Sequence, residues 1–202
     1  MKGWLIMAQV VREDFAALKY WLGLSTLLTA ADDDKIVASA NMKNGAYTIA
    51  AQPSAPSLIG IKATAVDTAD TMGIVTMVAV DVWGQTFTEV ITPVAGSTVY
   101  STRYAKSITS LTGSGWAIDA VDGSNDTLII GVLASAGIEC RGANMTIIVA
   151  TGNVWINPRT TAVADVTSIK LTAGQSLDLV VNDVLSLISD ASGATFQVLF
   201  WE

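Results

Sequence analysis

The side chains that most often perform chemistry in proteins are scarce in this sequence. It contains no histidine and a single cysteine, Cys140. Without histidine, a Ser-His-Asp triad, a Cys-His pair and a His-ligated zinc site cannot form, and the commonest general base near neutral pH is missing. Arg141 could lower the pKa of the neighbouring Cys140 thiol. A lone cysteine at the end of a predicted strand is, however, more often a small buried apolar residue.

The acidic residues gather in predicted turns rather than in a pair that is suited to catalysis. Asp32–Asp34, Asp122–Asp126 and Asp190 lie in such segments, where local hydrogen bonding favours aspartate. The second segment superficially resembles a calcium loop, but it lacks the spaced ligands and the closing glutamate of an EF-hand. Gly113-Ser114-Gly115 lacks the Lys-Ser/Thr of a phosphate-binding loop. We therefore expect no catalytic residues, no metal and no cofactor, and interpret the protein as non-enzymatic.

The composition indicates a protein that packs against other proteins. Of the 202 residues, 51% are apolar and 14% are charged, whereas about 25% is the usual charged share. Part of such a surface is expected to be covered by neighbours, so we predict a homo-oligomer, a trimer; a monomer with a Thr- and Ser-rich surface is the alternative. The net charge of −7 and the 11 scattered basic residues argue against binding to nucleic acid and to anionic membranes.

The sequence offers no sign of export or of a membrane span. The apolar run at the N-terminus is short and ends at Arg12-Glu13-Asp14, which does not match a signal peptide. No segment reaches the roughly 18 apolar residues of a membrane span, and one cysteine cannot form an intrachain disulfide. We expect the protein to be assembled in a cytoplasm.

The first part of the chain is predicted to be an N-terminal arm, residues 1–57. Val11, Phe15, Leu18 and Leu22 follow the spacing i, i+4, i+7, i+11, which predicts a helix over residues 11–28. An Asn-Gly turn and two prolines within residues 44–57 predict a turn followed by an extended linker. Apolar and aromatic side chains near the two ends of the chain are the candidate protein-interface residues, because aromatic residues are enriched at interface hot spots: Trp4, Phe15, Leu18, Trp21, Leu22 and Trp201.

The remainder is predicted to be all-β. The run Ile74–Val80 suits a strand that is buried on both faces, and the turn Trp83-Gly84-Gln85 joins it to a second strand, residues 86–92, in a hairpin. Many short strands at such spacing predict β-sandwich or jelly-roll-like modules, over residues 58–150 and 151–202; one large sandwich is the alternative. Further strands are expected at residues 97–103, 106–112, 115–120, 127–133, 145–150, 168–171, 176–181, 185–187 and 196–200.

Several of these segments resemble a known class of protein. Residues 73–92, 101–112 and 126–132 look like a β-rich module of tailed-bacteriophage structural proteins. Residues 168–180 and 185–201 are similar to C-terminal β-modules of phage capsid decoration and fibre proteins. The chain lacks the long coiled-coil or collagen-like stalk of a fibre. The resemblance therefore implies a capsid decoration (cement) protein of the virion, with the major capsid protein or other virion proteins as partners and no catalytic signature.

Two other functions compete with this interpretation. The chain could be a tail, tail-tip or fibre-associated virion protein built from the same modules. It could instead be a carbohydrate-binding β-sandwich module, but Trp83, Trp116 and Trp155 do not form a readable row on one sheet face. If the arm serves attachment to a particle, we expect residues 45–202 to fold without it.

Overall fold

The described part of the protein is built from strands alone. The computed structural model describes residues 18–27, 30–64, 71–117, 126–158, 167–190 and 193–201, and these ranges contain no helix. The all-β prediction is therefore confirmed. The strands are β1 (Leu18–Thr26), β2 (Asp32–Asn41), β3 (Gly45–Ala46), β4 (Ser57–Thr64), β5 (Ile74–Val80), β6 (Thr86–Ile91), β7 (Thr98–Tyr100), β8 (Ser107–Ser114), β9 (Thr127–Glu139), β10 (Asn144–Thr151), β11 (Asn153–Asn157), β12 (Ile169–Thr172), β13 (Ser176–Val180), β14 (Val184–Ser189) and β15 (Thr195–Trp201).

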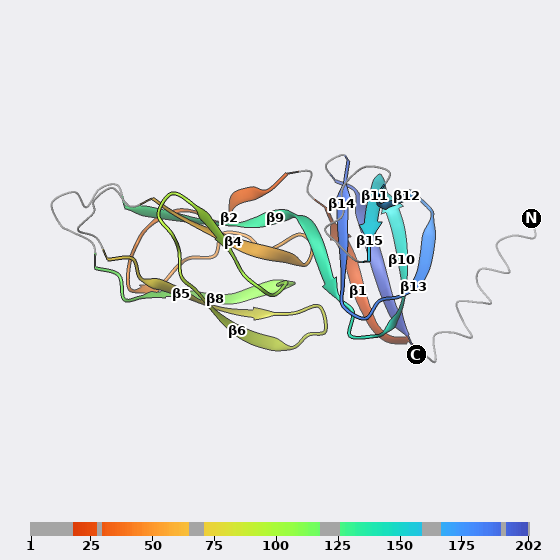
Figure 1. Ribbon diagram of the computed structural model, residues 1–202, viewed down its shortest axis with the longest axis horizontal. Coiled ribbons are helices and arrows are strands. Elements are labelled where there is room, and N and C mark those ends of the chain that lie inside the picture. The colour runs from red at the N-terminus through yellow and green to blue at the C-terminus, as the bar shows by residue number, and fades with distance from the viewer. Residues whose placement is uncertain are drawn as a thin grey trace, which may run out of the picture.

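The molecule is elongated and has two lobes (Figure 1). The first lobe consists of β2 to β8 and the first half of β9. The second lobe consists of β1, the second half of β9, and β10 to β15. Each lobe has its own cluster of buried apolar side chains. A single strand, β9, contributes to both clusters.

Strand β9 connects the lobes without a hinge or loop. It has 13 residues, so at about 3.3 Å per residue it extends roughly 40 Å. Its first half pairs with β4, where Ile61 lies opposite Ile130, and its second half pairs with β14, where Leu185 lies opposite Ile138. Both halves belong to one sheet, with the order β12-β11-β14-β9-β4-β7, and β2 also pairs with β9. The hydrogen bonds of this sheet therefore run from one lobe into the other.

The first lobe has its core between this sheet and a second sheet of order β3-β8-β5-β6. On β5, Val75, Met77 and Ala79 are fully buried, whereas the residues between them are half-buried. The strand predicted at Ile74–Val80 is therefore present, but only one of its two faces is fully buried and the other is half-buried. The predicted hairpin is confirmed, because β5 and β6 pair antiparallel from Val80 opposite Thr86 onward.

The second lobe has its core between a sheet of order β1-β15-β10-β13 and the β12-β11-β14-β9 part of the shared sheet. Period-two alternation in the sequence selects the buried face of each strand. The predicted module boundary between residues 150 and 151 falls within the second lobe, at the exposed end of β10. The buried residues on its central strands are Ile138, Met145, Ile147, Val149, Val154, Ile156, Leu185, Leu187, Phe196, Val198 and Phe200.

The helix predicted over residues 11–28 is wrong for the part that the structure describes. Leu18–Thr26 forms β1, which pairs antiparallel with β15; residues 11–17 lie outside the described ranges. An i, i+4 spacing such as that of Leu18 and Leu22 satisfies an even, strand-like period as well as a helical one. The edge of β15 supplies hydrogen-bond partners for the backbone, and this tertiary pairing decides between the two.

Two smaller predictions also need correction. Asp32–Asp34 was expected to lie in a turn, but it begins β2, whose Asp32 lies opposite Val132 of β9. Of the strand expected at residues 115–120, the structure describes residues 115–117, which make only an isolated bridge between Ala117 and Thr71.

Candidate functional site

The turn between β5 and β6 is organised by one aspartate side chain. The backbone N–H of Asp81 donates to the Gln85 carbonyl (2.9 Å), and the N–H of Gly84 donates to the Asp81 carbonyl (3.1 Å). The Oδ1 atom of Asp81 accepts from the backbone N–H groups of Trp83 and Gln85, both at 2.9 Å. Gly84 has a φ of 78°, which glycine adopts without steric cost. The sequence Asp-Val-Trp-Gly-Gln thus forms a rigid turn.

This turn belongs to the first lobe, but its tip packs into the second. Val82 is buried within the apolar cluster of the second lobe, and Trp83 packs against the same cluster. The Trp83 ring centroid lies 4.4 Å from that of Phe200, and its Nε1 donates to the Glu139 carbonyl (2.8 Å). A tip of one lobe therefore fills part of the core of the other.

An ionic cluster around a buried aspartate connects the same turn to two other segments. The Asp81 side chain is fully buried, and its Oδ2 accepts from Arg103 (3.1 Å) and from Arg141 (2.8 Å). The carboxylate of Glu139 lies 3.7 Å and 3.8 Å from the same two guanidinium groups. We call Asp81, Arg103, Glu139 and Arg141 the clasp. Because both oxygens of Asp81 have partners, the cost of burying its charge is offset by four hydrogen bonds.

Aromatic rings orient the two arginines of the clasp. The guanidinium carbon of Arg103 lies 4.0 Å from the centroid of the Phe87 ring, and that of Arg141 lies 5.8 Å from the Trp83 ring. Such cation–π contacts favour planar guanidinium groups over ammonium groups. Arg141 also has a φ of 51°, a left-handed conformation that is uncommon outside glycine. This backbone geometry places Arg141 in the turn between β9 and β10.

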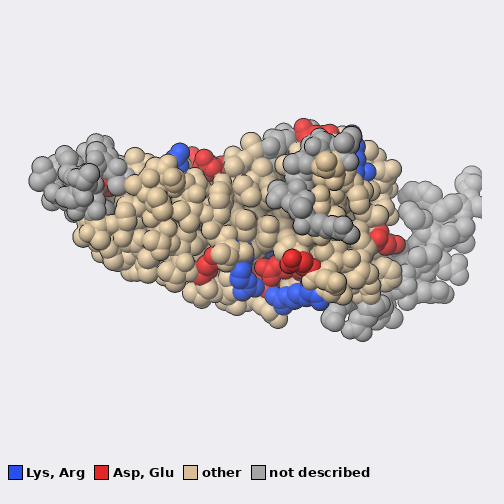
Figure 2. Space-filling model, in the orientation of Figure 1, with Lys and Arg blue, Asp and Glu red and all other residues tan. Residues whose placement is uncertain are grey.

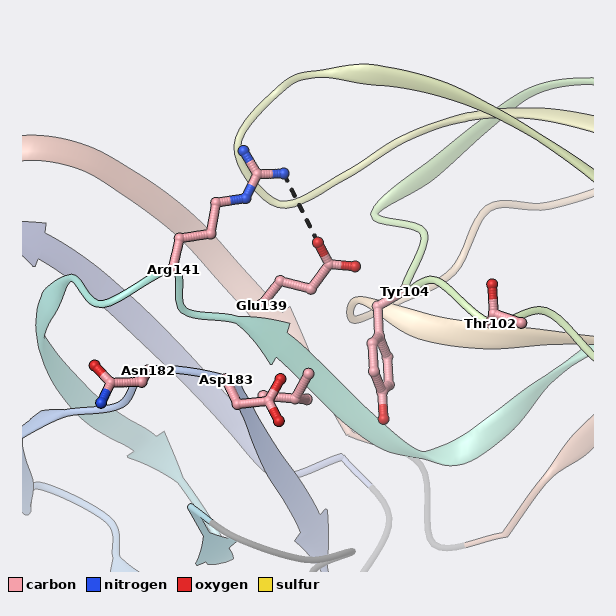
Figure 3. Close-up of a pocket in the computed structure, with 7 residues that line it drawn as sticks. Thr102, Tyr104, Glu139, Arg141, Asn182 and Asp183 are labelled. Carbon is pink, nitrogen blue, oxygen red and sulfur yellow. Dashed lines mark ion pairs between the residues drawn. The ribbon is translucent and has the colours of Figure 1, made fainter.

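Beside the clasp lies an open cleft of about 270 Å³ between the lobes. The loop after β7 contributes one wall, and the end of β9 and the loop before β14 contribute the other (Figure 3). The residues labelled there that line the cleft are Thr102, Tyr104, Glu139, Arg141, Asn182 and Asp183.

The Tyr104 side chain packs directly against a glycine of β9. A Cβ atom at Gly137 would overlap the Tyr104 ring, so the ring lies directly against the strand. Burial raises the pKa of the Tyr104 phenol, and the charges of Glu139 and Asp183 raise it further. The two carboxylates thus create a negative potential at the phenol oxygen.

The cysteine near this site is not arranged as a nucleophile. Cys140 is fully buried, and its thiol donates to the Ile138 carbonyl (3.1 Å). Burial raises the pKa of the thiol to about 12, which keeps it protonated and unreactive at neutral pH. Arg141 directs its guanidinium group to Asp81 instead. Within the described ranges, no group of three or more Cys, Asp or Glu side chains is placed to hold a metal ion.

The structure brings together some of the interface residues that the sequence predicted. Leu18 lies opposite Trp201, Trp21 lies opposite Leu199, and Leu22 lies opposite Val198 of β15. Trp201 is half-buried, and its indole N–H has no hydrogen-bond partner among the described residues. Trp4 and Phe15 lie outside the described ranges. These residues remain predicted, untested interface residues.

The tryptophans considered for carbohydrate binding are dispersed. Trp83 packs on the core of the second lobe, whereas Trp116 is buried in the core of the first. Trp155 is half-buried on β11, with the Lys170 ammonium 5.1 Å from its ring centroid. They do not share a sheet face.

Comparisons with protein-family models, with curated proteins and with solved structures find no match to this chain. No helix in the described ranges has the length and the apolar character needed to cross a membrane.

Proposed function

We propose that this chain is a non-catalytic structural protein that assembles with other protein subunits through the edges of its sheets. In line with the resemblance described above, the proposed setting is a tailed-phage virion, with the protein acting as a capsid decoration protein on the major capsid lattice. We interpret each lobe as a β-sandwich module and the clasp as the connection that keeps the two modules in a fixed relation.

The observation that carries this proposal is the position of the exposed apolar side chains. Among the described residues, each large apolar side chain that is exposed lies on an outermost strand or directly after one. A sheet edge with unpaired backbone groups is a template for pairing with another chain, and exposed apolar side chains beside it favour such contact. They are Val90 on β6 (56% exposed), Val94 after β6 (53%), Tyr100 on β7 (37%), Ile169 on β12 (46%) and Val180 on β13 (63%).

The distribution of charge supports the same proposal. On the face drawn in Figure 2, charged side chains occupy a few separate groups, with a dense one at the junction of the lobes, and most of the remaining described surface is uncharged. The clasp uses two of the 11 basic residues for internal contacts. Little charge is left to prevent association at the sheet edges.

An elongated protein with several edges suits the reinforcement of a lattice. Edges at both lobes would allow one subunit to contact more than one neighbour. Several weak contacts on a rigid body act together, because the first contact raises the effective concentration for the next.

Self-association can be tested with single substitutions at the sheet edges. Light scattering of the purified chain at tens of micromolar should show an oligomer. Substituting an edge residue with lysine should weaken association about tenfold or more, because a charge would be buried at the contact. The variants are Val90→Lys, Tyr100→Lys, Ile169→Lys and Val180→Lys, and the matched control is Thr109→Lys, at an exposed position on the inner strand β8. A monomeric wild-type protein, or equal association of all five variants, would contradict the proposal that the chain associates through its sheet edges.

The virion setting needs a separate experiment. Gold-labelled antibodies against the purified chain should decorate the capsids of phage particles that carry its gene. Labelling of the tails instead of the capsids would favour the alternative, a tail-associated protein, over a capsid decoration protein. Absence from particles, together with binding to a glycan array, would favour the carbohydrate-binding class instead.

A further inference from the structure

We propose that Asn44 is a deamidation site that the fold protects, and that its modification permanently marks a chain that has unfolded. The reaction converts the side-chain amide to an acid and needs water as its one co-reactant. Asn44 lies between β2 and β3, and Gly45 begins β3. This inference does not depend on the proposed assembly, because it concerns one contact within the first lobe.

Asn44 precedes the residue type that hinders deamidation least. The sequence contains one Asn-Gly dipeptide, Asn44-Gly45. The backbone nitrogen of Gly45 attacks the carboxamide carbon of Asn44 and closes a succinimide ring, while its proton passes to Nδ2, which leaves as ammonia. Water then opens the ring at either carbonyl and gives aspartate or isoaspartate. Glycine has no Cβ that could block the approach, and both residues are exposed to water.

The fold directs the Asn44 side chain to another segment of the chain. Its Nδ2 donates to the backbone carbonyl of Trp116 (3.1 Å), and its Oδ1 accepts from the backbone N–H of Trp116 (3.0 Å). Both polar atoms are thus engaged by a buried residue 72 positions further along the chain. The carboxamide must leave both hydrogen bonds before Gly45 can attack it, so we expect the reaction to be slow in the folded protein.

The backbone around Asn44 is fixed as well. The Tyr47 hydroxyl donates to the Lys43 carbonyl and accepts from the Lys43 N–H, both at 3.1 Å. Gly45 pairs with Gly113 of β8, and a Cβ atom at Gly113 would overlap the Lys43 carbonyl oxygen. Because β8 lies so close to this turn, the Gly45 nitrogen has little freedom to approach the Asn44 side chain while the first lobe is folded.

Deamidation destroys the contact that delays it. An ionised aspartate has two acceptor oxygens and no donor, so one oxygen at position 44 would face the carbonyl oxygen of Trp116. Isoaspartate, in addition, lengthens the main chain by one carbon atom and displaces the carboxylate. Trp116 belongs to the apolar cluster of the first lobe. A chain that is modified while unfolded should therefore refold to a less stable first lobe.

Deamidation of the full chain with and without concentrated urea tests the protection. Both samples are kept at the same mildly alkaline pH, and peptide mapping measures the fraction of Asn44 that becomes acid. The folded chain should react about tenfold more slowly or less, because two hydrogen bonds must open first. Asn153 is the internal control and should stay intact in both samples, because the β-branched Val154 follows it and hinders the attack.

Two glycine variants separate the Trp116 contact from overall stability. Gly113→Ala places a methyl group against the backbone of the turn and against the Trp116 ring, so it should release Asn44 and speed its deamidation without urea. Gly60→Ala is the matched control, because its methyl group would overlap the Tyr100 side chain of the same lobe instead. It should leave the rate unchanged. If Gly113→Ala does not fold, the urea comparison and the next variant decide.

Asn44→Asp reproduces one of the two products. It should shift the unfolding equilibrium about tenfold toward the unfolded state. Asn41→Asp adds the same charge at the exposed end of β2, where the side chain makes no hydrogen bond among the described residues, and should shift it little. Equal deamidation rates with and without urea, or wild-type stability of Asn44→Asp, would overturn the proposal. A folded Gly113→Ala that reacts no faster than Gly60→Ala would overturn the role of Trp116.

Discussion

The guanidinium group of Arg141 lies 2.8 Å from the buried carboxylate of Asp81, although the two residues are 60 positions apart and belong to different lobes. Arg141 follows β9 and Asp81 directly follows β5, so this contact joins the two lobes at the turn whose Trp83 packs against the core of the second lobe. The junction is thus held by charge-assisted hydrogen bonds around an apolar plug, and its components can be tested separately.

Replacing Asp81 should destabilise the protein more than replacing any exposed carboxylate. Asp81→Ala leaves two guanidinium groups and two backbone N–H groups without their acceptor. Loss of one partner of a buried ion pair costs about 3–5 kcal/mol. The side chains of Arg103 and Arg141 are 37% and 41% exposed, so water compensates in part and we expect a loss of about 2–3 kcal/mol. Urea unfolding measures this free energy.

The control for this experiment is Asp178→Ala, which removes an exposed carboxylate from β13. It should change stability by less than about 0.5 kcal/mol. A similar, small effect of both substitutions would show that the clasp does not stabilise the junction.

Gly137→Ala should displace the Tyr104 ring from its packed position against β9. The added methyl group would overlap the ring, and overpacking of this kind costs about 1–3 kcal/mol. In a Tyr104→Ala background the same substitution should cost little, because the obstacle is gone. A double-mutant cycle in urea therefore measures the coupling between the two residues. Equal costs of Gly137→Ala in both backgrounds would contradict the packing.

The buried thiol should make stability fall at alkaline pH. Burial raises the pKa of Cys140 from 9.0 to about 12, so between these values the unfolded chain loses a proton that the folded chain keeps. The stabilising contribution is complete below pH 9 and is lost as the pH rises toward 12. Between pH 8 and pH 10 the loss should be about 1.4 kcal/mol.

Cys140→Ala isolates this effect from other groups that titrate in the same range. Burial also raises the pKa of Tyr47, Tyr100 and Tyr104, but these residues are present in both proteins. The stability difference between wild type and variant should therefore narrow by about 1.4 kcal/mol from pH 8 to pH 10. If the free energy of unfolding of wild type and variant changes equally with pH, the thiol does not contribute to the pH dependence.

Truncations should separate assembly from folding. Residues 18–202 keep every described core contact, so this chain should unfold cooperatively with the stability of the full chain. Residues 45–202 lack β1 and β2, and with β2 the fully buried Ile36 and the buried Val37. We expect this shorter chain not to fold, which reverses the expectation from sequence. Circular dichroism during urea unfolding distinguishes the outcomes; a cooperative transition of residues 45–202 would contradict the packing of β2.

Light scattering of the chain of residues 18–202 then tests the candidate interface residues. If residues 18–202 fold but associate less than the full chain, the segment that contains Trp4 and Phe15 contributes to the interface. If the association of residues 18–202 equals that of the full chain, the interface is assigned to the sheet edges alone.

The strands that the sequence predicted well are those with local signals. The β5–β6 hairpin has an apolar run, a turn with Gly84 and a second run, all within a short segment. β10 and β15 show clear alternation, and their buried faces follow it. Local periodicity and turn chemistry are sufficient for such elements.

The elements that were missed depend on distant partners. β1 pairs with β15, from the opposite end of the sequence, and its own spacing suits two periods. β2 begins with three aspartates, which indicate a loop unless its pairing with β9 is known. No local pattern marks Asp81 as the centre of an ionic cluster, because Arg103 and Arg141 are 22 and 60 positions away. An aspartate at the end of a strongly apolar strand is the only signal that the sequence offered for the clasp.

The pairing of β1 with β15 also affects the order of events during synthesis. β1 is translated long before β15, and the two strands lie side by side in the finished sheet. At about 5–20 residues per second, the ribosome needs roughly 10–35 s to reach β15. For that time the partner of β1 does not exist, and an unpaired strand is open to non-native pairing. The second lobe must therefore close after translation has passed residue 201, while the first lobe, whose strands end within β9, has all of its segments much earlier.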